Sequence, residues 1–407
     1  MDFGRLDDPE SDRRYELQRL RPILRFSSNP AADLAARPSV SWSSVVLFEA
    51  LLYIPFLLPP FPFRRILFIS INTALCFHIM RGTLHRSYGD DFALAVGLFG
   101  QLQRFCDFFG CAGAPEENKE LTRKGWNGGF RDWNWKQRLK CVSDFWWNTR
   151  GIGWGWETRP RRGAGTSDSL PKSQFLAYHL RRIALLFAIG IPLHRYYPSV
   201  EAVFQASISE RILRSLACGV IVGIFIDVSY SISAFVCVSL GLFTPQDWPP
   251  AYGSVTSCYS IRRTWAFWHQ MLTHMVTSHG DWISGVLGCT KGSKAEWFVR
   301  LYTAFFLSGL LHSVPAWAIS RTDGGSMCFF MLQAVGISIE EAIWKPLGQR
   351  LGARGWLVKV LGLVWTLTWF GLTNIIFFEG LVAIGMKPLI DWKWVLGDRG
   401  LGLLKVW

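Results

Sequence analysis

The sequence predicts an all-α, multispanning helical membrane protein with about seven to nine transmembrane helices. Half of the 407 residues are hydrophobic and only 18% are charged, whereas soluble domains carry charge on about a quarter of their residues. The mean hydropathy is positive, at +0.19. The chain also contains 21 Trp residues, which favour the headgroup region of a bilayer because one end of the ring is apolar and the other hydrogen-bonds.

The individual spans are predicted from apolar runs, because a helix needs about 20 residues to cross the hydrocarbon core. The clearest runs are 42–60, 66–84, 175–193, 212–244, 296–320, 326–344 and 356–386. The run 212–244 is too long for one untilted helix, so we expect a tilted or a broken helix there. Residues 91–111 are weaker, since Arg104 and Asp107 interrupt them. The number of spans therefore stays open between seven and nine.

We expect a polar tail over residues 1–40 and a single membrane-embedded domain over residues 41–407. Two long polar segments, about 112–174 and 245–295, are rich in Lys and Arg and are predicted to face the cytosol. An even number of crossings separates them. The basic tail should also be cytosolic, which requires either that residues 91–111 do not fully cross the membrane or that another crossing is miscounted.

Several functional classes are excluded by the composition. The formal charge of +13 indicates a cytosolic face or an anionic ligand in a membrane protein, and we expect no nucleic-acid partner. The nine Cys residues show no Cys-x-x-Cys pair and no zinc spacing, so we expect neither a metal site nor a disulfide framework. The sequence also contains no G-x-S-x-G, Walker or G-x-G-x-x-G motif.

His312 is the first candidate for chemistry. It lies about two-thirds along the apolar run 296–320, where inserting an ionisable side chain costs about 2–3 kcal/mol and usually marks a functional site. Ser308 precedes it by one helical turn on the same face, and Gly309 permits close approach of another backbone or a ligand. The structural alternative is a His that hydrogen-bonds a neighbouring helix.

His269 is the second candidate, in the aromatic stretch SIRRTWAFWHQ between Trp268 and Gln270. This stretch predicts an interfacial helix with a polar face toward a cavity, and the alternative is a solvated His at the membrane surface. His274 and His279 follow without a convincing metal geometry, so we expect both to be dispensable.

Charged residues inside or beside apolar runs form a third group. Asp227, Glu340 and Glu341 are each expected to orient a His, to pair with an Arg, or to make a helix-packing hydrogen bond. Arg150 opens the glycine–aromatic stretch RGIGWGWE, where it meets either an anionic cofactor or a lipid headgroup.

Five segments together resemble the wax synthase-like branch of the membrane-bound O-acyltransferases, in particular the fungal members that acetylate terpenoids and meroterpenoids. The order and spacing of these segments are similar to those of the family. They are RGIGW at 150–154, WPPAYGS at 248–254, SIRR…FWHQ at 260–270, FFLSGLLH at 305–312 and FFMLQAVGISIEEAI at 329–343.

The resemblance implies a multi-pass enzyme of the endoplasmic reticulum with an internal tunnel. It implies transfer of an acyl group to a hydroxyl of a hydrophobic terpenoid-type alcohol. We expect the acyl group to be acetyl, supplied by acetyl-CoA. His312 matches the buried catalytic His of the family, and His269 matches its partner. No permanently bound cofactor is implied, and the acyl-CoA is a co-substrate.

A neutral His in a low-dielectric tunnel takes the proton of the attacking hydroxyl, while His269 or Gln270 holds the thioester carbonyl or the oxyanion. The residues expected to contact substrate or CoA are Gln270, Trp268, Ser308, Arg262, Arg263 and Arg150. Two alternatives stay open, a wax-ester synthase for long-chain alcohols and a membrane transporter. A transporter often shows inverted repeats, and no repeat is visible here.

Overall fold

The computed structural model describes residues 34–85, 87–111, 115–158, 169–193, 196, 206–268, 270–344, 346 and 355–383. Within these ranges the chain is helical, and its strand-like pairings are two isolated bridges, Ser39–Thr83 and Arg123–Trp154. The predicted all-α membrane fold is confirmed. Most of the predicted N-terminal tail, residues 1–33, lies outside the described residues, and so does His269.

Three helices form the N-terminal part of the molecule. They are α3 (Trp42–Leu57), α4 (Arg64–Arg81) and α5 (Tyr88–Cys106), and α5 runs into the π-helix η1 (Asp107–Cys111). The Ser87 hydroxyl accepts a hydrogen bond from the Asp90 amide and so caps α5, whose first turn is acidic as its dipole favours. The weak run 91–111 thus forms a regular helix that ends in a widened turn.

The two polar segments contain short helices. The first carries η2 (Phe130–Asp132) and α6 (Trp135–Trp147), and the second carries η5 (Pro245–Asp247), η6 (Val255–Ser257), α10 (Ile261–Phe267) and α11 (Thr273–Val286). A reciprocal pair of hydrogen bonds between Asn134 and Gln137 starts α6. The described parts of these segments are therefore folded and not open loops.

In the part of the chain that the structure describes, five helices are long and apolar enough to cross a membrane. They are α7 (Lys172–Leu193), α9 (Ile208–Ser239), α12 (Lys294–Ser320), α13 (Ser326–Ile339) with its π-helical continuation η7 (Glu340–Trp344), and α15 (Gly355–Ala383). The run 212–244 lies mostly in one continuous helix of 32 residues, which begins at Ile208 and ends at Ser239. A helix of that length is about 48 Å long, so it tilts in a core about 30 Å thick or extends beyond it. The total of seven to nine spans stays a prediction.

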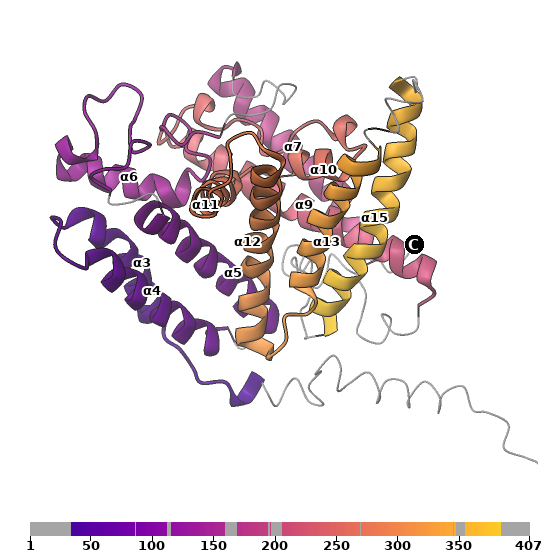
Figure 1. Ribbon diagram of the computed structural model, residues 1–407, viewed down its shortest axis with the longest axis horizontal. Helices are drawn as coiled ribbons and strands as arrows, with labels where there is room; N and C mark the ends of the chain where they lie inside the picture. Colours follow the sequence, from indigo (N-terminus) through magenta and orange to yellow (C-terminus); the bar gives the residue numbers. More distant parts are fainter. Residues whose placement is uncertain are drawn as a thin grey trace, which may run out of the picture.

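The helices pack as a row of neighbours (Figure 1). Along this row α7 contacts α9, α9 contacts α15, α15 contacts α13 and α13 contacts α12, while α5, α4, α3 and α6 continue the row on the other side of α12. Helix α11 packs on α12 as well. The centre of the row is thus α12, the helix that carries His312.

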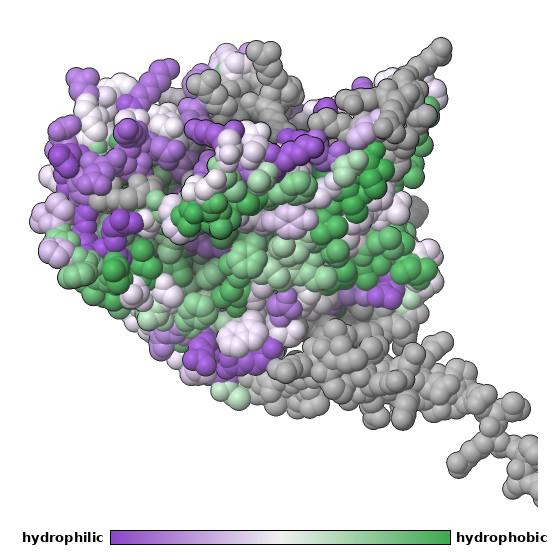
Figure 2. Space-filling view, in the orientation of Figure 1, coloured by the Kyte–Doolittle hydropathy of each residue, from purple (hydrophilic) through white to green (hydrophobic). Residues whose placement is uncertain are grey.

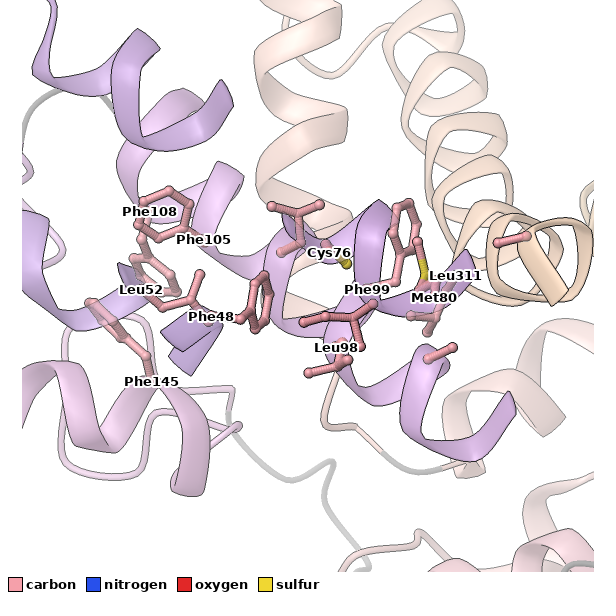
Figure 3. Packing of buried hydrophobic residues seen from close by; sticks show 14 of the residues in the cluster. Phe48, Leu52, Cys76, Met80, Leu98, Phe99, Phe105, Phe108, Phe145 and Leu311 are labelled. Atoms are coloured by element: carbon pink, nitrogen blue, oxygen red, sulfur yellow. The ribbon is translucent and has the colours of Figure 1, made fainter. Parts of the chain in front are cut away.

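The apolar side chains lie both inside the protein and on its outer surface. Inside, Phe48 and Leu52 of α3 pack with Phe105, Phe108 and Phe145 (Figure 3). On the outside, apolar residues form a band across the middle of the molecule, with polar residues above it over α6 (Figure 2). An outward-facing apolar band of this kind suits contact with lipid chains.

Candidate functional site

The segments RGIGW and WPPAYGS are joined by a buried arginine. The Arg150 guanidinium is 4% exposed, and its Nη1 donates to the carbonyl oxygens of Pro249 at 3.0 Å and Pro250 at 2.7 Å. The Tyr230 hydroxyl of α9 donates to the Pro249 oxygen as well. Arg150 therefore has a structural role that the sequence did not reveal, and its contact with CoA stays a prediction.

The alternating glycines of RGIGW are explained by backbone geometry. Gly151 and Gly153 have φ values of +64° and +83°, in the left-handed region that favours glycine. A Cβ atom at Gly151 would lie only 2.3 Å from the Trp156 ring. The spacing that resembles part of a dinucleotide-binding motif is thus a tight turn that presents Arg150 and Trp154.

WPPAYGS in turn supports the segment FWHQ. The Gly253 amide donates to the Phe267 carbonyl at 3.0 Å, and the Tyr252 ring packs edge-on against Trp268 at 5.6 Å. On its other side Trp268 faces α9, because a Cβ atom at Gly223 would lie 3.5 Å from its ring. Trp268, the residue before His269, is therefore fixed between a loop and a membrane helix.

The segment FFMLQAVGISIEEAI holds the start of α10. The Glu340 carboxylate accepts from the backbone amides of Ile261 at 2.6 Å and Arg262 at 3.1 Å, and from the Trp365 indole at 3.1 Å. Its neighbour Glu341 lies 3.8 Å from the exposed Arg262 side chain. The predicted Glu–Arg pair is thus confirmed for Glu341, whereas Glu340 caps the helix that leads to FWHQ.

Glu340→Ala is expected to lower both thermal stability and activity, because two backbone donors at the start of α10 and the Trp365 indole of α15 lose a charged acceptor. Each hydrogen bond to a charged group contributes about 1.5–3 kcal/mol. The measurement is the midpoint of thermal unfolding in detergent. Glu341→Ala is the matched control, with a change of less than about 1 kcal/mol for a surface ion pair. Equal midpoints for the two variants would contradict this role of Glu340.

His312 lies among aromatic rings contributed by α13 and α15. Its half-buried ring is parallel to Phe330, with centroids 5.1 Å apart, and meets the edge of Phe377 at 5.5 Å. The Trp265 ring of α10 also contacts Phe330, at 5.9 Å. His312 and the helix that precedes FWHQ therefore share one aromatic neighbour. Since His269 itself lies outside the described residues, its pairing with His312 stays a prediction.

The two small residues before His312 have separate roles. The Ser308 hydroxyl donates to the Ala304 carbonyl of its own helix at 2.9 Å. A Cβ atom at Gly309 would lie 2.7 Å from the Met327 sulfur, which confirms close approach of α13 at this point. The Gln270 amide likewise donates to the Ala266 carbonyl at 2.9 Å. The polar groups of Ser308 and Gln270 are thus both held by hydrogen bonds within one helical turn, and contact of either residue with a substrate stays a prediction.

The start of α10 also carries exposed cations. The Arg263 guanidinium lies 4.5 Å from the centre of the Tyr259 ring, and the Lys359 ammonium of α15 lies 5.9 Å from the same centre. Neither cation is paired with a carboxylate among the described residues. Arg262, which is also exposed, lies beside Arg263 in the first turn of α10. Arg262, Arg263 and Lys359 form a basic surface, named here the Tyr259 patch, at the start of the helix that leads to FWHQ.

A buried histidine clamp, which the sequence did not reveal, lies beside this region. The His274 ring contacts Asp107 through Nδ1 at 3.0 Å and Glu120 through Nε2 at 3.1 Å, and it stacks on Phe108. Ser278 donates to the other Asp107 oxygen. The Phe108 ring also meets Trp156 of the RGIGWGW turn. The clamp thus joins η1, the first polar segment and α11.

The clamp favours a charged imidazole. Burial lowers the pKa of His274, but the hydrogen bonds and charges of Asp107 and Glu120 outweigh burial and raise the pKa to about 9. The hydrogen bond from His274 lowers the pKa of Glu120. Because Asp107 lies 167 residues before His274, no local pattern indicates this contact. Within the described part of the chain, no group of three His, Cys, Asp or Glu residues suits a metal ion.

Comparison with known proteins adds to this geometry. Residues 248–332 match the sequence model of the membrane bound O-acyl transferase family. This range contains WPPAYGS, FWHQ and His312, and within it both Trp265 and His312 contact Phe330.

Similar proteins are fungal acetyltransferases. Acetyltransferase ple2 of Rhodocybe pseudopiperita is 29% identical over 58% of this chain and 64% of its own length. Acetyltransferase eriL of Hericium erinaceus is 34% identical over 37% of the chain and 40% of its own length. Acetyltransferase sirH of Emericella nidulans is 26% identical over 81% of the chain and 82% of its own length.

The matched parts cover less than two-thirds of the length of ple2 and eriL. Even so, the family match falls on the segments that build the site, and the relatives carry the names of acetyltransferases. The resemblance of this chain to the membrane bound O-acyl transferase family, and to fungal proteins named acetyltransferases, is therefore confirmed.

Proposed function

We propose that this protein is an acyl-CoA-dependent O-acyltransferase of the endoplasmic reticulum membrane. It moves an acetyl group from acetyl-CoA to a hydroxyl of a hydrophobic, terpenoid-type alcohol. The observation that carries the proposal is the position of His312, an ionisable residue within an apolar helix of the family-matched range. Its ring stacks on Phe330, which also contacts Trp265 of the segment that leads to FWHQ. The printed names of the relatives support acetyl as the transferred group.

The reaction needs one base and one donor. In this proposal a nitrogen of neutral His312 takes the proton of the alcohol hydroxyl as its oxygen attacks the thioester carbonyl carbon. A hydrogen-bond donor from the FWHQ segment, His269 or Gln270, stabilises the oxyanion. The C–O bond forms, the C–S bond breaks, and the proton on His312 passes to the departing CoA thiolate. The aromatic rings around His312 exclude water, which would otherwise compete as acceptor.

Acetyl transfer by the purified protein in detergent tests the proposal. Labelled acetyl-CoA is supplied with a panel of diterpenoid, sesterterpenoid and meroterpenoid alcohols, and ester formation is measured. Esters formed from palmitoyl-CoA and a long-chain alcohol, with none from acetyl-CoA, would instead support the wax-ester synthase. Absence of any ester, together with transport of an alcohol by the protein in liposomes, would support the transporter.

The polar end of acetyl-CoA is proposed to dock on the Tyr259 patch. Removing both unpaired cations, Arg263→Gln with Lys359→Gln, is expected to raise the KM for acetyl-CoA about tenfold, since about 1.4 kcal/mol of attraction to the phosphates is lost. The KM for S-acetyl-N-acetylcysteamine, a thioester without phosphates, should stay unchanged. Lys136→Gln is the matched control, because Lys136 also lies against an aromatic ring, that of Trp135, but on α6. A rise in both KM values would contradict phosphate docking.

A further inference from the structure

The interface between α7 and α9 has a definite register. The Arg182 guanidinium of α7 makes two hydrogen bonds with the Asp227 carboxylate of α9, at 3.0 and 2.5 Å. Toward the start of α7, Phe175 lies in one buried cluster with Ala234. Helices α7 and α9 are antiparallel and rise by the same distance per residue. The residues between Phe175 and Arg182 therefore lie at the level of the residues between Asp227 and Ala234. This register places His179 at about the level of Ser231 along the interface.

His179 and Ser231 are buried polar side chains whose hydrogen-bonding capacity is unused. His179 is 3% exposed and Ser231 is fully buried. Among the residues that the structure describes, neither ring nitrogen of His179 has a hydrogen-bond partner. The Ser231 hydroxyl has none there either. The Trp248 indole nitrogen also has no hydrogen-bond partner among the described residues, and the Trp248 ring packs against the cluster that contains Phe175. Since the Phe175 ring lies 4.4 Å from the His179 ring, the unpartnered groups of His179 and Trp248 belong to residues that border the same cluster.

Such an arrangement is costly within a membrane, because lipid chains offer no hydrogen bonds to replace those of water. Helix α7 is the most lipid-exposed of the five candidate spans, with Leu180 and Leu185 pointing outward. A group that satisfies His179, Ser231 and Trp248 must both donate and accept, since imidazole and hydroxyl do both and indole only donates. A hydroxyl group does so, whereas a ketone only accepts.

The charges of the interface favour a neutral ligand. Arg182 is already neutralised by Asp227, and the remaining groups at this place carry no fixed charge. The surrounding side chains, Phe175, Ala234 and Val238, are apolar. We infer that the α7–α9 interface binds the hydroxyl group of a neutral, largely apolar alcohol that reaches it from the bilayer. As a site for the acceptor, this inference rests on the proposed function.

The interface also lies next to the candidate active site. One turn of α9 before Asp227, Gly223 faces the Trp268 ring and accepts a hydrogen bond from Tyr252 through its carbonyl oxygen. One residue before Ser231, Tyr230 bonds the Pro249 carbonyl of WPPAYGS. Helix α9 therefore contacts both α7 and the loop and aromatic residues next to FWHQ, and an alcohol held between α7 and α9 would lie on the same helix as those contacts. This position suits a site that the acceptor occupies before it reaches His312.

Photolabelling tests the inference without requiring acyl transfer. The probe is a diterpenoid alcohol that carries a diazirine, and a deoxy probe without the hydroxyl is the matched ligand. Labelled peptides from the full-length protein in bilayer nanodiscs are identified by mass spectrometry. We expect the alcohol probe to label residues 172–193 and 208–239, with about tenfold lower apparent affinity for the deoxy probe, as expected for loss of hydrogen bonds.

Two variants with a matched control separate a ligand site from simple packing. Ser231→Ala and His179→Phe should each weaken labelling by the alcohol probe and leave the deoxy probe unaffected. Ser233→Ala is the control, because Ser233 lies on the exposed face of α9 and donates to the Ser229 carbonyl. Since Ser231→Ala removes one oxygen atom only, it keeps the test valid where His179→Phe does not fold.

The inference is overturned if both probes label α7 and α9 equally, or if Ser231→Ala behaves like Ser233→Ala. It is also overturned if neither helix is labelled, in which case only water satisfies His179 and Ser231. Labelling that depends on the hydroxyl in a protein that forms no ester would keep the site and remove the proposed function. Ester formation without labelling would keep the function and remove this site.

Discussion

His312→Ala is expected to lower the rate of acetyl transfer by about 10²- to 10⁴-fold, which corresponds to about 3–5 kcal/mol of barrier, while the protein stays folded. The reason is that the alcohol hydroxyl loses its base, whereas the helix keeps its apolar packing. The loss of contacts with Phe330 and Phe377 leaves a cavity, but removal of a buried polar ring also relieves a desolvation cost. Activity should therefore change far more than stability.

The measurement is the rate of ester formation per mole of folded protein, with folding followed by size-exclusion chromatography and thermal unfolding. His78→Ala is the control, because His78 is an exposed histidine of α4. His269→Asn should keep part of the activity that His269→Ala loses, since an amide still donates a hydrogen bond to the carbonyl but cannot act as a base. Normal turnover by His312→Ala would remove the central claim and strengthen the transporter alternative.

His274→Ala is expected to destabilise the protein by about 3–5 kcal/mol, the usual effect of removing one partner of a buried ion pair. The Asp107 carboxylate, whose side chain is 1% exposed, would keep Ser278 but lose its charged partner. The sequence alone predicted that His274→Ala stays near wild type in acyl transfer, which stays a prediction, whereas the contacts of the clamp lead us to expect a loss of stability. Thermal unfolding in detergent measures the change.

His279→Ala is the matched control for this variant. His279 lies on the same helix and only 3.8 Å from Asp107, but its Nδ1 is 2.8 Å from the Met275 carbonyl of its own helix. We therefore expect a smaller change for His279→Ala, as the sequence predicted. If the two variants unfold at the same temperature, the clamp contributes no stability of its own.

The clamp also predicts how stability depends on pH. Because folding raises the pKa of His274 from 6.5 to about 9, its contribution is complete below about pH 6.5 and is lost as the pH rises through 9. Folding lowers the pKa of Glu120, so the contribution of that carboxylate is lost on the acid side. His274→Ala should therefore remove the loss of stability between pH 7 and 9 that the wild-type protein shows.

Helix positions could be predicted from the sequence because lipid offers the backbone no hydrogen-bond partners. The runs 175–193, 296–320 and 326–344 correspond to α7, α12 and α13 within a few residues. In a bilayer every amide and carbonyl must bond within the chain, so a long apolar run specifies a helix by itself. The same reasoning singled out His312, since its cost at that depth depends only on the run around it.

The sequence could not reveal how the helices face one another. Glu340 was recognised as an unusual charge, but its bonds to Ile261 and Arg262 join positions nearly 80 residues apart. Arg150 has a cationic side chain that suits an anion, and yet its donors point to the prolines of WPPAYGS. In each case residue type gave the available chemistry, while packing selected the partner.

The sequence by itself thus determined an all-α membrane protein, the segments that resemble an acyltransferase, and a histidine placed where chemistry is expected. Only the tertiary structure decided that His274 clamps Asp107 to Glu120, and that His179 and Ser231 are buried without a hydrogen-bond partner among the described residues. The physical reason is that helix formation depends on neighbours along the chain. A buried ion pair or an unsatisfied polar group instead depends on the rotation and register of helices that are distant in sequence.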